Sequence, residues 1–290
     1  MGAYILIARD LPVHNQNRVP ERAIFAISSS GKEIAMIAYD HAPASLSPDA
    51  SRLAFPFNNP FRSTAYSIRI LALSNYELID FDVRMTAGFP LIWSPDQSAI
   101  AFYEAGGISA VDTSSGVATP TLRCPSLFRY DAGVTCFPIA WSPDGRWLAH
   151  TLEIDPPDPR YPVDAVRLLD TNCLSSPDSC GSKDYAVMPL STVLSWSPDS
   201  RYLATLTSPR ALALFDVIVW QRAKSYTLPS TPSAITWSPD GDTIVFQATT
   251  GIYAYSISTG EASHVTSLPY DAVLLGWLEV QSDGAASFKK

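Results

Sequence analysis

Five aspartates recur in one short motif and are the first candidates for chemistry in this sequence. Asp49, Asp96, Asp144, Asp199 and Asp240 each end a Ser-Pro-Asp sequence. Carboxylates repeated at similar spacing could supply a ring of oxygen ligands for a cation. The same motif is also a turn signal, because proline presets the backbone angle of the second turn position and aspartate is favoured beside it. We therefore interpret these aspartates as residues of structural turns and expect no metal there.

Tryptophan precedes four of the five motifs, at Trp93, Trp141, Trp196 and Trp237. Aromatic rings repeated in this way could form a platform on which sugars stack. Their equivalent positions in a repeat favour a different role, since each ring can pack between its own repeat and the neighbouring one. We expect these tryptophans to belong to the core.

Histidine is scarce, and the four residues His14, His41, His150 and His264 occupy unlike positions in the repeat. A metal-dependent lyase would need several imidazoles that converge on one point. His14 and His41 could share one face, which leaves a two-histidine site open as an alternative. A glycine-rich phosphate loop, a His-Glu-x-x-His helix and a Gly-x-Ser-x-Gly nucleophile elbow are missing from the sequence. We predict no cofactor and no catalytic residue.

The four cysteines form two local pairs, Cys124 with Cys136 and Cys173 with Cys180, which enclose 11 and 6 residues. Four cysteines allow three connectivities, and proximity in sequence favours these two bridges. Common zinc sites use closer Cys-x-x-Cys pairs. We predict two disulfides, with free thiols as the alternative. Paired cysteines indicate an oxidising compartment, so the localisation would then be periplasmic, secreted or that of an anchored ectodomain.

The motifs are parts of a longer repeat that organises the whole chain. Each turn leads into a short apolar strand such as Ile100-Ala101-Phe102. The positions before the five serines, with a degenerate sixth copy at Trp277, are separated by 47, 48, 55, 41 and 40 residues. This period is expected of one four-stranded blade of a β-propeller. We predict an all-β, six-bladed β-propeller of four-stranded antiparallel blades.

The two ends of the sequence predict how the ring closes. Only 13 residues follow Trp277, whereas the N-terminal part has three strand-like segments, at 4–8, 23–27 and 33–38, without a preceding motif turn. We expect a C-terminal strand at 272–279 to enter as the innermost strand beside them, which removes open sheet edges. The chain 1–290 is then one domain with a composite blade from 3–39 and 270–280 and complete blades at 44–86, 88–124, 138–190, 192–229 and 233–268.

The Trp-Ser-Pro-Asp-Gly turn followed by an Ile/Leu-Ala-Phe strand resembles the WD40-like, PD40-type propeller repeat of the TolB family, over nearly the whole chain. The resemblance implies a fold whose function changes through its loops. The sequence has no room for the additional N-terminal α/β domain of periplasmic TolB proteins, so a role in envelope assembly is not implied. Prolyl-oligopeptidase-like peptidases share the repeat, but their hydrolase elbow is missing here.

Loop lengths are uneven on the side opposite the Ser-Pro-Asp turns. Segments 10–21, 56–65, 123–138 and 153–163 are long, whereas 208–210 and 248–250 are short. Binding residues concentrate on such loops, and Arg and Tyr are frequent in binding hot spots. We expect a recognition surface here, called the long-loop face, formed by His14, Arg18, Arg22, Arg62, Tyr66, Phe128, Arg129, Tyr130, Asp131, Asp155, Arg160 and Tyr161.

Composition narrows the classes of function. With 47% hydrophobic and 17% charged residues the chain can form a core, and its net charge of −8 provides no basic surface for nucleic acid. No apolar run approaches the ~20 residues of a spanning helix. We predict a non-catalytic scaffold for a protein or peptide partner, without nucleic acid and without membrane insertion of this segment. Two alternatives stay open: a carbohydrate lyase or lactone or ester hydrolase with a channel site, and a sensor ectodomain of a membrane-anchored protein.

Overall fold

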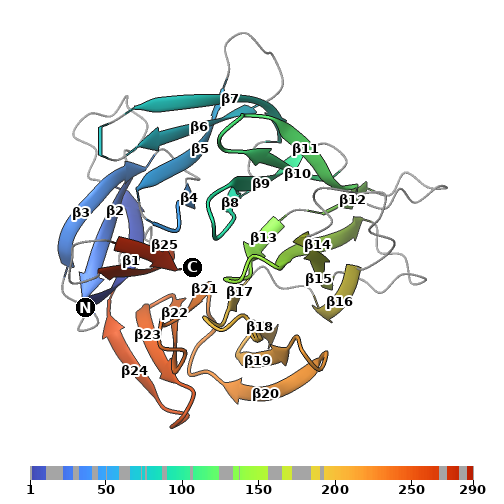
Figure 1. The fold of residues 1–290 in the computed structure, drawn as a ribbon. Helices are drawn as coiled ribbons and strands as arrows, with labels where there is room; N and C mark the ends of the chain where they lie inside the picture. Colours follow the sequence, from blue (N-terminus) through green and yellow to red (C-terminus); the bar gives the residue numbers. More distant parts are fainter. Residues whose placement is uncertain are drawn as a thin grey trace. The chain divides into compact units, whose positions relative to one another are not determined.

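A computed structural model describes residues 2–10, 22–28, 33–40, 45–49, 51–58, 66–72, 74–75, 77–86, 90–104, 107–123, 133–136, 138–155, 165–171, 184–189, 193–267, 273–280 and 286–289. These residues form β-strands in antiparallel sheets of four or five strands (Figure 1). None of the described segments is a helix with the length and hydrophobicity to cross a membrane. The chain divides into two compact units, 43–192 and 1–42 with 193–290, which we describe separately.

The unit of residues 43–192 contains three sheets. The first consists of β4 (Ser45–Leu46), β5 (Arg52–Asn58), β6 (Tyr66–Ala72) and β7 (Leu78–Met85). The second consists of β8 (Ile92–Trp93), β9 (Ala99–Glu104), β10 (Gly107–Asp112) and β11 (Ala118–Arg123). The third consists of β12 (Gly133–Thr135), β13 (Pro138–Trp141), β14 (Trp147–Asp155), β15 (Ala165–Asp170) and β16 (Asp184–Pro189).

The other unit also contains three sheets. One consists of β17 (Leu194–Trp196), β18 (Tyr202–Ser208), β19 (Ala211–Asp216) and β20 (Gln221–Thr227). Another consists of β21 (Ala234–Trp237), β22 (Thr243–Ala248), β23 (Gly251–Ser256) and β24 (Ala262–Thr266). The last, called the composite sheet, joins both ends of the chain in the order β26 (Ala286–Lys289), β25 (Val273–Val280), β1 (Gly2–Asp10), β2 (Arg22–Ser28) and β3 (Glu33–Asp40).

Each Ser-Pro-Asp motif forms the same hydrogen-bonded turn between two consecutive, paired strands of its sheet. The buried serine hydroxyl donates to the aspartate carboxylate two residues later, at 2.5–2.6 Å. The same hydroxyl accepts the backbone N–H five residues after it, at 2.8–2.9 Å. The carboxylate also accepts the N–H two residues after it, at 3.0–3.1 Å. These bonds satisfy polar groups that would otherwise be costly to bury, so the motif stabilises the turn.

The turn ends on a residue in the left-handed region of backbone space. Gly145 and Gly241 take this conformation, with φ of 76° and 75°, as the sequence motif leads one to expect. Gln97 and Ser200 take it as well, with φ of 62° and 60°. The hydrogen-bond network therefore holds even side-chain-bearing residues in a conformation that costs them about 1–2 kcal/mol.

Removing one motif serine tests the structural role of these turns. Ser238→Ala deletes a hydroxyl that donates to Asp240 and accepts from the backbone of Thr243. We expect the free energy of unfolding to fall by about 1–3 kcal/mol, because the partly buried N–H of Thr243 and the carboxylate of Asp240 both lose their partner. Denaturant titration measures the loss. The matched control is Ser258→Ala in the same sheet, an exposed hydroxyl that bonds to Asp242 at 3.1 Å and whose loss should cost less than about 0.5 kcal/mol. Equal losses in both variants would contradict the role assigned to the motif.

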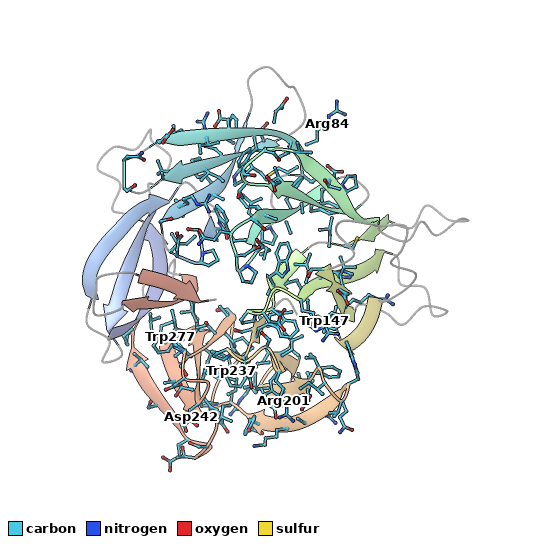
Figure 2. All side chains as sticks on the ribbon, in the orientation of Figure 1. Arg84, Trp147, Arg201, Trp237, Asp242 and Trp277 are labelled. Carbon is cyan, nitrogen blue, oxygen red and sulfur yellow. The ribbon has the colours of Figure 1, made fainter. Side chains whose placement is uncertain are left out.

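The core lies between neighbouring sheets within each unit. Several side chains of the second strands are fully buried: Leu53, Ile100, Phe102, Ile244 and Phe246 are each 0% exposed. In the unit of residues 43–192, side chains of the sheets β4–β7 and β8–β11 form one cluster. In the other unit, the composite sheet and the sheet β21–β24 share a cluster of Ile5, Val245, Ile252, Leu274 and Trp277 (Figure 2).

The C-terminal strand pairs with the N-terminal strand, as the sequence predicts. In β25 and β1, Trp277 lies opposite Ile5 and Val280 lies opposite Gly2 (Figure 1). The expectation that this strand would be innermost is wrong, because β26 adds a further strand on the free edge of β25. Its sequence Ala-Ser-Phe-Lys is too short to carry a periodic signal. A second addition is β12, which pairs with the end of β14 inside the segment expected to be a loop.

Candidate functional site

Most residues of the expected long-loop face lie outside the described residues. These are His14, Arg18, Arg62, Phe128, Arg129, Tyr130, Asp131, Arg160 and Tyr161. Arg22 begins β2 and Asp155 ends β14, so both belong to strands rather than loops. Tyr66 begins β6 and is 36% exposed. The described residues therefore do not test whether these candidates lie together, and this surface stays a prediction.

The candidate cysteines and histidines are only partly covered by the described residues. Cys136 is fully buried and disulfide-bonded, whereas Cys124, Cys173 and Cys180 lie outside the described residues, so the two pairings stay predictions. His150 is buried in β14. His264 is exposed in β24 and lies edge-on to Tyr253, with ring centroids 5.1 Å apart. His14 and His41, the alternative two-histidine site, are also outside the described residues.

Two motif tryptophans, Trp93 and Trp237, pack against the preceding sheet. The Trp93 indole N–H donates to the carbonyl of Ser45, one sheet earlier, at 2.9 Å. In the other unit, Trp237 donates in the same way to the carbonyl of Ser195, at 3.2 Å (Figure 2). Both rings are at most 6% exposed. These contacts agree with a core role, and Trp237 also lines a pocket between two consecutive motif turns.

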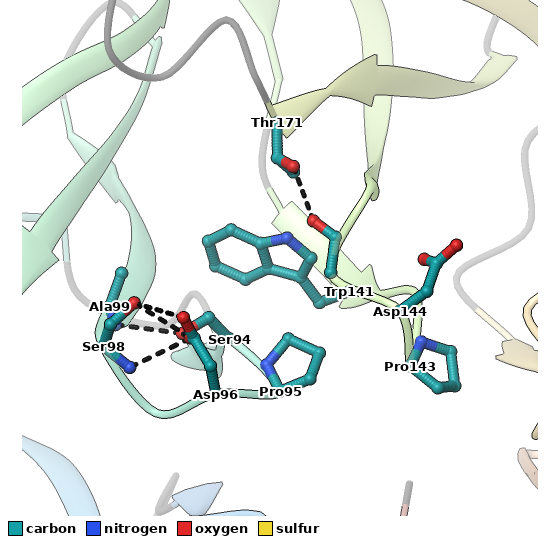
Figure 3. A pocket seen from close by; sticks show the side chains of 10 residues that line it. Ser94, Pro95, Asp96, Ser98, Ala99, Trp141, Pro143, Asp144 and Thr171 are labelled. Carbon is teal, nitrogen blue, oxygen red and sulfur yellow. Dashed lines mark hydrogen bonds between the residues drawn. The ribbon is translucent and has the colours of Figure 1, made fainter.

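One such space is a pocket of about 490 Å³, which we call the Trp141 groove. Trp141 forms its floor, and the turns that carry Asp96 and Asp144 form its two sides (Figure 3). The remaining lining residues come from the same two turns and from Thr171 in the β15–β16 connection: Ser94, Pro95, Ser98, Ala99, Pro143 and Gly145. Thr171 is tied to the second turn, since its N–H donates to the carbonyl of Arg146 at 2.9 Å.

An equivalent pocket of about 250 Å³ lies in the other unit, which we call the Trp237 groove. It has Trp237 as its floor and the turns of Asp199 and Asp240 as its sides. Tyr202 occupies the position that corresponds to Ala99, which accounts for its smaller volume. The two grooves therefore repeat one arrangement, in which an aromatic floor lies between two exposed carboxylates.

Hydrogen bonds favour the charged form of the carboxylates beside these grooves. The Ser238 hydroxyl and the backbone N–H of Asp242 lower the pKa of Asp240. Partial burial alone would raise the pKa of Asp96, but hydrogen bonds from Ser94 and Ser98 outweigh it and lower that pKa. Both groups are ionised at neutral pH, because an ordinary aspartate already ionises near pH 4. The grooves thus present negative charge beside an indole ring.

Sequence reasoning assigned the turn side a structural role only, and it missed the grooves. The signal lies in the fifth residue after each motif serine, which is Arg52, Ala99, Trp147, Tyr202 or Thr243. A small residue there leaves the next tryptophan uncovered. The described residues include no group of three or more His, Cys, Asp or Glu side chains placed to hold a metal ion.

A second feature that sequence reasoning missed is the apolar connection between β19 and β20. Ile218 and Val219 are 67% and 53% exposed. Trp220 has φ of 55°, whereas glycine stands at the equivalent turn positions, Gly116 and Gly260. A tryptophan in this conformation stores about 1–3 kcal/mol of strain, which its edge-on contact with the Phe215 ring helps to offset. A missing turn glycine is the signal that could have revealed it.

Solved structures of several other proteins are similar to this chain. The TolB protein of Acinetobacter baumannii is similar with a TM-score of 0.59 and 16% identity, over 90% of this chain and 62% of that one. This chain thus spans less than two thirds of that TolB chain. A chain of a nidogen/laminin complex has a TM-score of 0.57 and 12% identity, covering 95% of this chain and 97% of its own. A chain of a mitotic checkpoint complex has a TM-score of 0.57 and 16% identity, covering 98% and 86%.

No protein-family profile matches the chain, so the PD40 type of the repeat stays a prediction. At these identities the structural likeness concerns the fold and not the activity. The neighbours are propellers, and the described sheets are antiparallel and mostly four-stranded, five of them with one motif turn each. The chain therefore has a β-propeller fold.

Proposed function

We propose that this chain is a non-catalytic propeller scaffold that binds a protein or peptide partner. In this proposal residues 1–290 form one domain of six blades, the sixth being the composite sheet. The six leading positions of the sequence repeat and the pairing of β25 with β1 support that count. Two local disulfides, Cys124–Cys136 and Cys173–Cys180, belong to the same proposal, which the bonded state of Cys136 supports.

The observation that carries the proposal is the repeated groove between consecutive motif turns. Each groove is open at the surface, since Asp96, Pro143 and Asp144 around the Trp141 groove are exposed or partly exposed. Sites for small molecules are usually enclosed and bury most of the ligand surface, which these open grooves would not do. Open grooves with an aromatic floor and a polar rim suit a side chain that projects from a larger partner.

The solved neighbours support a binding role by analogy. Two of the similar propeller chains come from structures of protein complexes, one of nidogen with laminin and one of the mitotic checkpoint. We place the binding surface at the motif turns, because each described groove is lined by two of them. The long-loop face is the competing location within the same proposal.

Peptide selection on the purified full chain tests the proposal. A random peptide library is selected against the wild-type protein, and the dissociation constants of enriched peptides are measured with two variants. Ala99→Arg fills the Trp141 groove, and the double variant Arg129→Ala/Tyr130→Ala alters the long-loop face. We expect Ala99→Arg to weaken binding at least tenfold, because it occupies the space over Trp141, while the double variant binds as the wild type does.

Each result decides between the locations. A loss confined to Arg129→Ala/Tyr130→Ala would move the binding site to the long-loop face and retain the scaffold proposal. If no library member is enriched, the scaffold proposal fails. If both variants bind every enriched peptide as the wild type does, neither of the two surfaces is the binding site and both locations are wrong. Near-ultraviolet circular dichroism of each variant confirms that the aromatic core is intact.

A further inference from the structure

The space between the first two motif turns is filled by a side chain of the protein itself. The guanidinium carbon of Arg52 lies over the Trp93 ring, 4.8 Å from its centroid. Its terminal nitrogen donates to the side-chain carbonyl of Gln97 in the next turn, at 2.9 Å. Asp49 and Asp96 are the motif carboxylates of the two turns. This junction shows which chemical group suits an indole floor between two such turns.

The Trp141 groove is the next junction along the chain, and it lacks both filling residues. Ala99 stands where the first junction has Arg52, and Gly145 stands where it has Gln97. A Cβ atom built on Gly145 meets no atom within 4 Å, so this side of the groove is open. The floor and the two carboxylates are retained as Trp141, Asp96 and Asp144 (Figure 3). The groove is therefore the same site without its internal occupant.

We propose that the Trp141 groove binds the guanidinium group of an arginine side chain from the partner. The proposal rests on the proposed function, since it names the chemistry of the partner that the scaffold binds. The arginine would stack on Trp141 as Arg52 stacks on Trp93, and its N–H groups would face the carboxylates of Asp96 and Asp144. Stacking on an indole and charge complementarity act together here.

The geometry selects arginine over lysine and over neutral side chains. A guanidinium is planar, so it can stack on the ring while its edge donates to carboxylates, whereas an ammonium is a compact point charge that keeps its hydration shell. A neutral urea group of the same shape keeps the stacking but loses the attraction to the rim. Binding should therefore follow the order arginine, lysine, citrulline.

The experiment uses the folded full-length protein and small probes. Nα-acetyl-arginine amide, Nα-acetyl-lysine amide and Nα-acetyl-citrulline amide are titrated while the tryptophan indole signals are followed by NMR, with Trp141 assigned through Trp141→Phe. We expect the arginine probe to shift the Trp141 signal in a saturable manner and the citrulline probe to bind at least tenfold more weakly. An arginine probe that leaves the Trp141 signal unchanged overturns the inference.

Two reciprocal variants make the test independent of any single substitution. Ala99→Arg/Gly145→Gln recreates the filled junction, and Gln at the turn position is tolerated because Gln97 has φ of 62° there. We expect this variant to lose arginine binding at Trp141 by at least tenfold. Arg52→Ala opens the first junction and should create a second arginine site, seen as a new shift of the Trp93 indole signal.

The outcomes separate this inference from the proposed function. Unchanged arginine binding in Ala99→Arg/Gly145→Gln, or no new shift of Trp93 in Arg52→Ala, would refute the comparison of the two junctions. Selected peptides that depend on the groove but tolerate replacement of their arginines would overturn the inference and leave the scaffold proposal standing. A groove that binds the arginine probe in a chain that enriches no peptide would support the inference and overturn the scaffold proposal.

Discussion

A chain that ends at Ser267 is expected to lose cooperative folding of the unit formed by residues 1–42 and 193–290. This truncation removes β25, whose Leu274 and Trp277 are each 6% exposed and pack with Ile5. Burial of a Leu and a Trp is each worth about 2–5 kcal/mol. Their sum is comparable to the whole stability of a typical domain, about 5–15 kcal/mol. Loss of the antiparallel pairing with β1 adds to it, so the remaining sheet should not persist.

Calorimetry and limited proteolysis measure this loss. The matched control is a chain that ends at Val280, which lacks β26 but keeps β25 and its buried side chains. We expect the control to unfold within a few degrees of the full chain, because β26 is an edge strand that pairs only with β25 among the described strands. If the chain ending at Ser267 unfolds like the control, then the composite sheet does not determine stability.

Replacement of either of two phenylalanines at equivalent positions of two sheets is expected to lower the free energy of unfolding strongly. Phe102 in β9 and Phe246 in β22 are both fully buried, one in each unit. Phe246 also stacks on Tyr253, with ring centroids 5.3 Å apart. Replacement of either by alanine leaves a cavity where the neighbouring strands cannot close in, so we expect a loss of about 3–5 kcal/mol in the free energy of unfolding.

Chemical denaturation of Phe102→Ala and Phe246→Ala also tests the proposal of a single domain. If the six sheets unfold as one cooperative ring, each variant moves the same single transition to lower denaturant. Two transitions, of which each variant shifts a different one, would mean that the two units unfold independently and that the single-domain proposal is wrong. Val219→Ala is the control, since Val219 is 53% exposed and its truncation should change stability by less than about 0.5 kcal/mol.

The repeated parts of the fold could be predicted because each carries its own local signal. The Ser-Pro-Asp turn combines a preset proline angle with an aspartate that accepts neighbouring N–H groups, so five copies mark five sheets without reference to the rest of the chain. The pairing of β25 with β1 could be inferred by counting strands at both ends. Short pieces such as β26 and β12 could not, because four or three residues contain too little periodicity to stand out.

The candidate site could be predicted far less well, because it depends on differences between repeats. Ala99 and Arg52 occupy the same repeat position, and only the structure shows that this side chain reaches over the tryptophan of the next sheet. The same holds for Trp220, which stands where Gly116 and Gly260 stand in other turns. The repeat pattern consists of the residues that its copies share. The grooves arise where the residue in one copy differs from the residue at the same position in the others.

The pairing of β1 with β25 has a consequence for the order of events during biosynthesis. Strand β1 is made long before its partner, which begins only at Val273. At about 5–20 residues per second, β1 waits roughly 10–60 s with one edge unpaired. Exposed strand edges attract other chains, and contacts between distant parts of a sequence form slowly. The nascent chain is therefore most open to aggregation before β25 has been synthesised, and the pairing of β25 with β1 ends that period.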